Sequence, residues 1–132
     1  LREIADAAVS FKIDGLITTN TTTDRPNSLI SENKTMEGGL SGRPLMAAST
    51  SVLRLLYQFT GGKIPIIGSG GVFTGEDAYL KIRSGASLVQ IYSALIYRGP
   101  YVAAKIVSEL SSYLKRDGFI HIKDAVGADV SL

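Results

Sequence analysis

The sequence contains no cysteine and no tryptophan, only one histidine, and no long apolar run. Without cysteine the chain can form no disulfide, no thiolate metal site and no cysteine nucleophile. A membrane-spanning helix needs about 18 consecutive apolar residues, so nothing in this chain is expected to cross a membrane by itself. The first residues also lack the basic start and apolar stretch of a signal peptide.

The chain also has little net charge. Its 14 basic and 12 acidic residues are interspersed and give a formal charge of +2, so no nucleic-acid partner is expected. The 132 residues are 45% hydrophobic and 20% charged, which is normal for a globular domain. We therefore expect residues 1–132 to form one domain or part of one.

Hydrophobic periodicity predicts helices that alternate with short strands. The first helix has no N-cap residue ahead of it, which indicates a piece cut from a longer polypeptide. Residues 24–48 have no clear period and are predicted to form a long loop, which is usually functional or disordered. The expected elements are a helix over 1–9, strands near 15–19, 64–68 and 87–92, a helix capped by Ser49 or Thr50 and ending at Gly61, a helix from Thr74 to about Ser84, a helix from Pro100 to Gly118, and one helical turn near 123–126.

This alternation predicts an α/β fold with a parallel sheet and helices outside it. Polar or glycine-rich residues follow each predicted strand, at the carboxyl end where parallel α/β proteins hold their active sites. A closed barrel needs eight strand–helix units and about 250 residues. This chain supplies three of them.

The stretch from Lys63 to Val72 is predicted to form an apolar strand, covered on both faces, that leads into a Gly-Ser-Gly-Gly loop. Such a loop can bring backbone N–H groups close to a phosphate, and the helix predicted to start at Thr74 would add its dipole. An ordinary tight turn explains a lone glycine cluster about as well. The next strand, predicted to be largely buried, ends at Tyr92 and Ser93, and barrels build phosphate sites from the loops after their last two strands.

Four motifs taken together are more specific: Thr18–Thr22, Gly38–Leu45, Ile66–Val72 and Gly85–Ser93. In this order and spacing they resemble the dihydroorotate dehydrogenases, over nearly the whole chain. The Gly-Leu-Ser-Gly-Arg-Pro-Leu form and the tail to Asp129 resemble the membrane-associated, quinone-using class. The resemblance implies the C-terminal three βα units of an FMN-binding (β/α)8 TIM barrel. Such an enzyme oxidises dihydroorotate to orotate in pyrimidine synthesis and passes the electrons through FMN to ubiquinone.

The resemblance also implies roles for individual residues. Asn20 and Thr21 match positions that bind the substrate, and their side chains offer both donors and acceptors, as a pyrimidine requires. Termination of a strand and capping of a turn is the alternative reading of such residues. The positions that match FMN contacts are Thr19, Gly42, Gly70, Gly71, Tyr92 and Ser93.

Tyr92, Ile96 and Pro100 match positions near the quinone tunnel of the membrane-associated class. Plain packing between strand and helix explains these three residues at least as well. Peripheral contact with the membrane would come from residues outside this chain. The implied location is the mitochondrial inner membrane, with the bacterial cytoplasmic membrane as the alternative.

The resemblance begins downstream of the family's serine base and of its flavin-contacting lysine. We therefore expect the catalytic base in the missing N-terminal part of the barrel, with no catalytic residue and no metal site in this chain. Ser41, Ser69 and Ser93 lie in glycine loops or phosphate motifs and are not substitutes for that base. His121, Asp124 and Asp129 are expected to be solvated surface residues.

Two other functions remain open at this point. The glycine loop could hold a sugar phosphate in another barrel enzyme, which a flavin absorbance band would exclude. The chain could instead be a non-enzymatic binding module of three βα units. Its unpaired strand edges should then cause it to aggregate or to pair with another chain.

Overall fold

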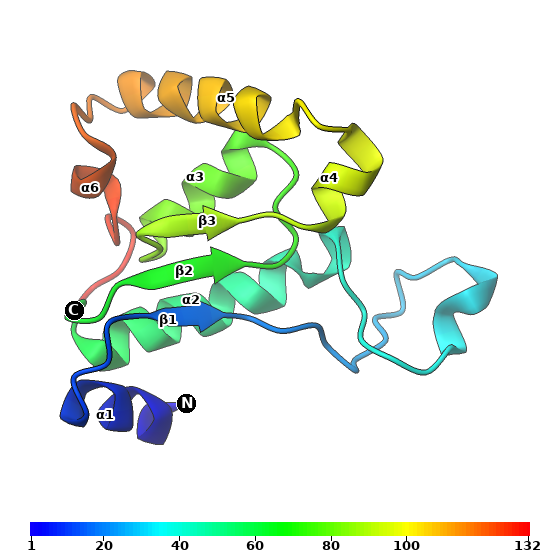
Figure 1. Cartoon of the computed structure of the whole chain (residues 1–132), viewed down its shortest axis with the longest axis horizontal. Helices are drawn as coiled ribbons and strands as arrows, with labels where there is room; N and C mark the ends of the chain where they lie inside the picture. The colour runs from blue at the N-terminus through cyan, green and yellow to red at the C-terminus, as the bar shows by residue number, and fades with distance from the viewer.

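Three short parallel strands form the sheet on which the rest of the chain is arranged (Figure 1). The computed structural model describes all 132 residues. Its strands lie in the order β1-β2-β3, so the predicted parallel sheet with three strand–helix units is confirmed. The elements are α1 (Arg2–Ser10), β1 (Leu16–Thr18), the 3-10 helices η1 (Glu32–Thr35) and η2 (Arg43–Leu45), α2 (Met46–Thr60), β2 (Ile66–Ser69), α3 (Gly75–Arg83), β3 (Leu88–Gln90), α4 (Ser93–Arg98), α5 (Val102–Arg116) and α6 (Ile122–Ala125).

The helices cover only one face of this sheet. Ile66 and Thr18 are buried on the helix side, whereas Ile17 of β1 is 66% exposed and Leu88 of β3 is 62% exposed on the other. The predictions of a strand near 64–68 covered on both faces and of a largely buried strand near 87–92 are therefore wrong for this chain. Apolar residues alternate between the two faces of a strand, and here the second face has no layer against it.

The ends of α2 and α3 follow the predicted signals. Gly61 ends α2 in the left-handed conformation, with φ +60°. The Thr74 hydroxyl accepts from the Asp77 amide, while the Asp77 carboxylate accepts from the Thr74 amide, which is a complete capping box. Both boundaries are set by local hydrogen bonds, which a sequence pattern can predict.

The predicted start of α2 is wrong. The helix begins at Met46, directly after η2, and Ser49 and Thr50 are buried inside its first turns. Their hydroxyls donate to the Met46 carbonyl at 3.1 and 2.7 Å instead of capping the helix. This extra turn brings α2 against the loop that follows β2.

Two further differences lie near the C-terminus. The helix α4 was not predicted, and α5 begins at Val102 and not at Pro100. The predicted helical turn near 123–126 is confirmed by α6. No helix in the chain combines the length and the apolar character that crossing a membrane requires.

The core consists of two clusters, and the second one supports the loops after β2 and β3. It lies beneath the β2–α3 loop and between α3, α4 and α5. Where α3 meets α5 the backbones are very close, because a Cβ at Gly75 would lie 2.2 Å from Cβ of Glu109. The members of this cluster are Val72, Phe73, Ala78, Ala94, Val102 and Ile106.

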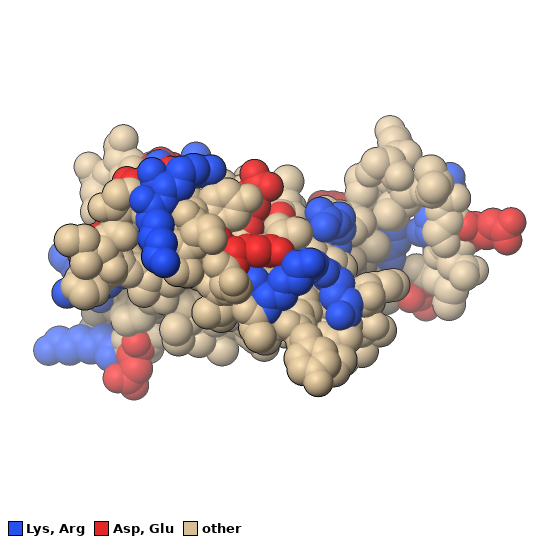
Figure 2. Space-filling view, turned by 90° about the horizontal axis from the view of Figure 1, so that it is seen from above, with Lys and Arg blue, Asp and Glu red and all other residues tan.

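The surface carries no single-sign area on the face drawn in Figure 2. Lys and Arg side chains there alternate with Asp and Glu side chains and with uncharged atoms. Arg83 donates to the carboxylates of Asp117 and Asp129, which ties α3 to the end of α5 and to the C-terminal tail. Asp129 is exposed, as predicted, although its carboxylate also pairs with Arg83, and His121 and Asp124 are exposed as predicted.

Candidate functional site

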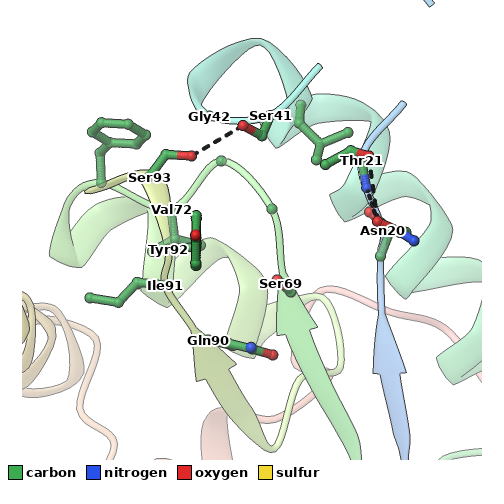
Figure 3. Close-up of a pocket in the computed structure, with 15 residues that line it drawn as sticks. Asn20, Thr21, Ser41, Gly42, Ser69, Val72, Gln90, Ile91, Tyr92 and Ser93 are labelled. Atoms are coloured by element: carbon green, nitrogen blue, oxygen red, sulfur yellow. Dashed lines mark hydrogen bonds between the residues drawn. The ribbon is translucent and has the colours of Figure 1, made fainter. Parts of the chain in front are cut away.

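A pocket of about 220 Å³ lies at the carboxyl ends of the three strands (Figure 3). All of the predicted substrate and FMN residues line it, although they come from four separate segments of the chain. No ionised side chain is among the lining residues. These are Thr19, Asn20, Thr21, Ser41, Gly42, Leu45, Ser69, Gly70, Gly71, Val72, Phe73, Gln90, Ile91, Tyr92 and Ser93.

Thr19, Asn20 and Thr21 form what we call the β1 side of the pocket. The hydroxyl oxygen of Thr19 is buried and has no hydrogen-bond partner in the chain. The Asn20 side-chain carbonyl accepts from the Thr21 amide at 2.7 Å, so its NH₂ group remains available to a ligand. A buried hydroxyl without a partner is unusual in a protein and indicates a missing ligand or water.

The long loop after β1 folds back and supports this side. Thr22 and Leu40 pair as an antiparallel bridge, and a Cβ at Gly39 would lie 1.8 Å from Oγ1 of Thr21, so only glycine fits there. The Arg25 guanidinium donates to the carbonyls of Met36 and Gly38 at 3.0 and 2.6 Å. This loop is thus held by backbone contacts and one arginine and not by an apolar core.

Gly70, Gly71 and Val72 form the glycine side of the pocket. Gly70 and Gly71 have φ values of +97° and +80°, which favour glycine. A Cβ at Gly71 would lie 2.5 Å from the backbone N and Cα of Met46. Glycine is therefore required here because the loop packs on the first turn of α2, and not because a side chain would project at a ligand.

The backbone amides of the glycine side are free. The N–H groups of Gly70, Gly71 and Val72 donate to no group of the chain. By contrast, the amides of Phe73 and Thr74 both donate to the Asp77 carboxylate at 2.9 Å. The loop therefore has the unpaired donors that an anion site needs.

The predicted dipole contribution of α3 is wrong. The amides of Phe73 and Thr74 are taken by Asp77, and the next amide, that of Gly75, donates to the carboxylate of Glu109 at 2.7 Å. The N-terminus of α3 is thus already occupied by two carboxylates of the chain itself, which oppose the approach of another anion.

The helix that starts at the pocket is α4. It begins at Ser93, directly after Tyr92, and no side chain caps it. The Ser93 hydroxyl lies 3.4 Å from that of Ser41 across the pocket mouth (Figure 3). Phosphate sites of parallel barrels use a short extra helix after the last strands. That rule was the one signal that could have predicted α4, because its sequence carries no capping residue.

The predicted quinone residues lie at one end of this region. Tyr92 lines the pocket and is 80% exposed, and Ile96 on α4 is 74% exposed. Pro100 is exposed in the turn before α5, and neither it nor Ile96 lines the pocket. Packing between strand and helix inside this chain does not explain these three side chains, because each of them is exposed.

Comparison with known proteins gives a consistent result. The family model for dihydroorotate dehydrogenase matches residues 1–114. The dihydroorotate dehydrogenase (quinone) of Xanthobacter autotrophicus is 53% identical over 130 residues, which cover 98% of this chain and 36% of that protein. The mitochondrial dihydroorotate dehydrogenase (quinone) of Oryza sativa is also 53% identical over 130 residues, which cover 98% of this chain and 28% of that protein.

The fold agrees with a solved structure. The crystal structure of the Eimeria tenella DHODH in complex with ferulenol matches with a TM-score of 0.95 and 52% identity, over 97% of this chain and 34% of that one. The chain thus spans about a third of the length of its relatives. Its three βα units form part of a (β/α)8 barrel, as expected. The chain belongs to the dihydroorotate dehydrogenase family.

Proposed function

We propose that the complete protein containing this chain oxidises dihydroorotate to orotate, with FMN as the hydride acceptor and ubiquinone as the final electron acceptor. This chain is its C-terminal part and contributes contacts to FMN and substrate but no catalytic base. The observation that carries the proposal is the pocket, which collects side-chain and backbone donors from the ends of three strands. The names of the relatives support the reaction, since they are dehydrogenases that use a quinone.

The residues present fit FMN. The free amides of Gly70 and Gly71, together with the hydroxyl of Ser93, suit a phosphate dianion, which accepts several hydrogen bonds. The buried Thr19 hydroxyl, which has no partner in the chain, suits a polar atom of a ring system. Gly42, with φ +78°, lies beside Ser93, because a Cβ at Gly42 would be 3.7 Å from the Ser93 hydroxyl oxygen. We assign Thr19, Gly42, Gly70, Gly71, Tyr92 and Ser93 to FMN.

Asn20 and Thr21 bind the substrate in this proposal. The Asn20 amide has unused donors, and the Thr21 hydroxyl both donates and accepts. An amide and a hydroxyl can form hydrogen bonds with the alternating N–H and C=O groups of a dihydropyrimidine ring. Both side chains are exposed at the pocket.

The reaction removes one proton and one hydride from adjacent carbons of the ring and leaves a double bond between them. FMN, when bound, supplies the hydride acceptor and passes the electrons on to the quinone. No carboxylate, histidine or lysine lines this pocket, and we do not assign its serines as the base, because Ser41, Ser69 and Ser93 lie in glycine loops or a phosphate motif. The base therefore belongs to the N-terminal part of the barrel, which would also cover the exposed Ile17 and Leu88.

Tyr92, Ile96 and Pro100 form the quinone end of the site in this proposal. Their exposure supports a contact that this chain alone does not make. Membrane contact is peripheral and comes from residues outside the chain. Relatives of equal identity are bacterial and mitochondrial, so we propose the mitochondrial inner membrane or its bacterial counterpart.

An anaerobic titration of the complete protein tests the proposal. We expect a flavin absorbance band that dihydroorotate bleaches and a quinone restores. A purified protein without a flavin band, or with a band that dihydroorotate leaves unchanged, would contradict it. Tight binding of a sugar phosphate by a flavin-free protein would favour the other barrel enzyme considered above.

A further inference from the structure

Lys81 of α3 is completely buried, although lysine is among the residues least often found inside a protein. Its Nζ donates to the hydroxyl of Ser49 at 2.5 Å and lies 3.4 Å from the carbonyl oxygen of Ser69. No carboxylate forms an ion pair with it. Lys81 therefore sits directly behind the glycine side of the pocket, on the helix side of the sheet.

This arrangement is costly for the fold. Burial lowers the pKa of Lys81 to about 8, while the negative charge of Asp77 on the same helix raises it and offsets part of the effect. An apolar side chain of the same length would avoid this desolvation. A buried, perturbed ionisable group next to a ligand pocket is a candidate for a functional role.

The contacts of Lys81 continue into the loop. Ser49 accepts from Lys81, and its single hydroxyl hydrogen is shared between the Gly70 carbonyl at 2.9 Å and the Met46 carbonyl at 3.1 Å. In a trans peptide the carbonyl and the following N–H point in opposite directions. Fixing the Gly70 carbonyl toward α2 therefore turns the Gly71 amide away from α2. The Ser69 carbonyl, which precedes the Gly70 amide, lies 3.4 Å from Lys81 Nζ and also accepts from the Thr19 amide at 3.4 Å, so Lys81 and β1 hold it together.

We propose that Lys81 is a positioning residue of the phosphate subsite: through Ser49 and the Ser69 carbonyl it orients the amides of Gly70 and Gly71 toward the pocket and adds a positive charge behind them. The inference rests on the proposed function, because it takes the ligand anion to be the FMN phosphate. It assigns a role to a residue that does not line the pocket and touches neither substrate nor cofactor.

The test compares FMN with riboflavin, which lacks the phosphate. Dissociation constants of both flavins are measured by fluorescence quenching on the complete apoprotein, for the wild type and for Lys81→Met. We expect Lys81→Met to weaken FMN binding about tenfold or more, and riboflavin binding by less than about threefold. The melting temperature should not fall, because the desolvation of the ammonium is removed. Lys105→Met, at an exposed position of α5, is the matched control and should change nothing.

Equal weakening of FMN and riboflavin, or no change for either, would overturn the role of Lys81. Should Lys81→Met fail to fold, Ser49→Ala decides the matter, because it removes the link to the Gly70 carbonyl and leaves the lysine in place. It should weaken FMN binding selectively, by about threefold to tenfold. A wild-type protein that binds neither flavin would instead contradict the proposed function itself, so the two failures are distinguishable.

Discussion

The two sides of the pocket are built differently. The β1 side offers side chains, namely the buried Thr19 hydroxyl and the exposed Asn20 and Thr21, and the loop behind it is held mainly by Arg25. The glycine side offers backbone amides and rests on the packed first turn of α2. Side chains can read the pattern of a ring, whereas backbone amides bind an anion of any kind. Mutations on the β1 side should therefore weaken substrate binding without affecting FMN binding, and mutations on the glycine side should weaken FMN binding.

The largest effect is expected on the glycine side, from Gly71→Ala. A Cβ there would meet the backbone of Met46 at 2.5 Å and would also force a side chain to φ +80°. Gly118→Ala is the matched control, because Gly118 has φ +79° with nothing within 4 Å. We expect the control to cost about 1–2 kcal/mol of unfolding free energy. Gly71→Ala should cost about 1–3 kcal/mol more, since the loop must also move away from α2.

Flavin content gives the second measurement on Gly71→Ala. Displacing the loop moves its free amides, so the purified variant should lose most of its FMN absorbance, whereas Gly118→Ala should keep it. A Gly71→Ala variant that keeps its full FMN absorbance would contradict the assignment of the glycine side to the cofactor.

A smaller effect is expected on the β1 side, from Arg25→Met. Its guanidinium holds the carbonyls of Met36 and Gly38, and through them the loop that crosses Thr21. Loss of these bonds should weaken orotate binding about tenfold, or about 1.4 kcal/mol, by isothermal titration calorimetry. FMN binding should stay the same. Lys34→Met, on the same loop, serves as the control. If it weakens orotate binding equally, the loss of a positive charge from the loop, and not the loss of the Arg25 hydrogen bonds, explains the effect.

The smallest effect is expected at the quinone end, from Ile96→Ser. Ile96 is 74% exposed in this chain, so only contact with an apolar ligand or with the rest of the barrel gives it a role. We expect the KM for ubiquinone to rise about threefold, with the anaerobic bleaching by dihydroorotate unchanged. The control is Ile120→Ser, at a position that is 87% exposed, which should leave both the KM for ubiquinone and the bleaching by dihydroorotate unchanged. A slower bleaching step would place Ile96 at the substrate side instead.

The sequence predicts those parts of the fold that depend on neighbouring residues. Thr74 and Asp77 lie three positions apart and form the capping box that the pattern indicates. Gly61 ends α2 for the equally local reason that glycine adopts positive φ. Motifs spread along the chain also predicted eight of the 15 residues that line the pocket, and these come together because parallel strands bring their carboxyl ends to one edge of the sheet.

The parts that were missed depend on tertiary contacts. Ser49 was expected to cap a helix but lies inside α2, where it bonds to the Gly70 carbonyl of a loop 21 positions away. Glu109 fills the N-terminus of α3 from another helix, which no local pattern indicates. Lys81 is buried against the preference of its residue type. These contacts decide which amides at the pocket stay free.

The most direct test of the account is the pair of dissociation constants for orotate and FMN in Asn20→Ala, measured on the complete protein. The account predicts that orotate binding weakens at least about tenfold, because the amide's hydrogen bonds to the ring are lost, while FMN binding changes less than about twofold. Equal weakening of both ligands would contradict the division of the pocket into a substrate side and a cofactor side.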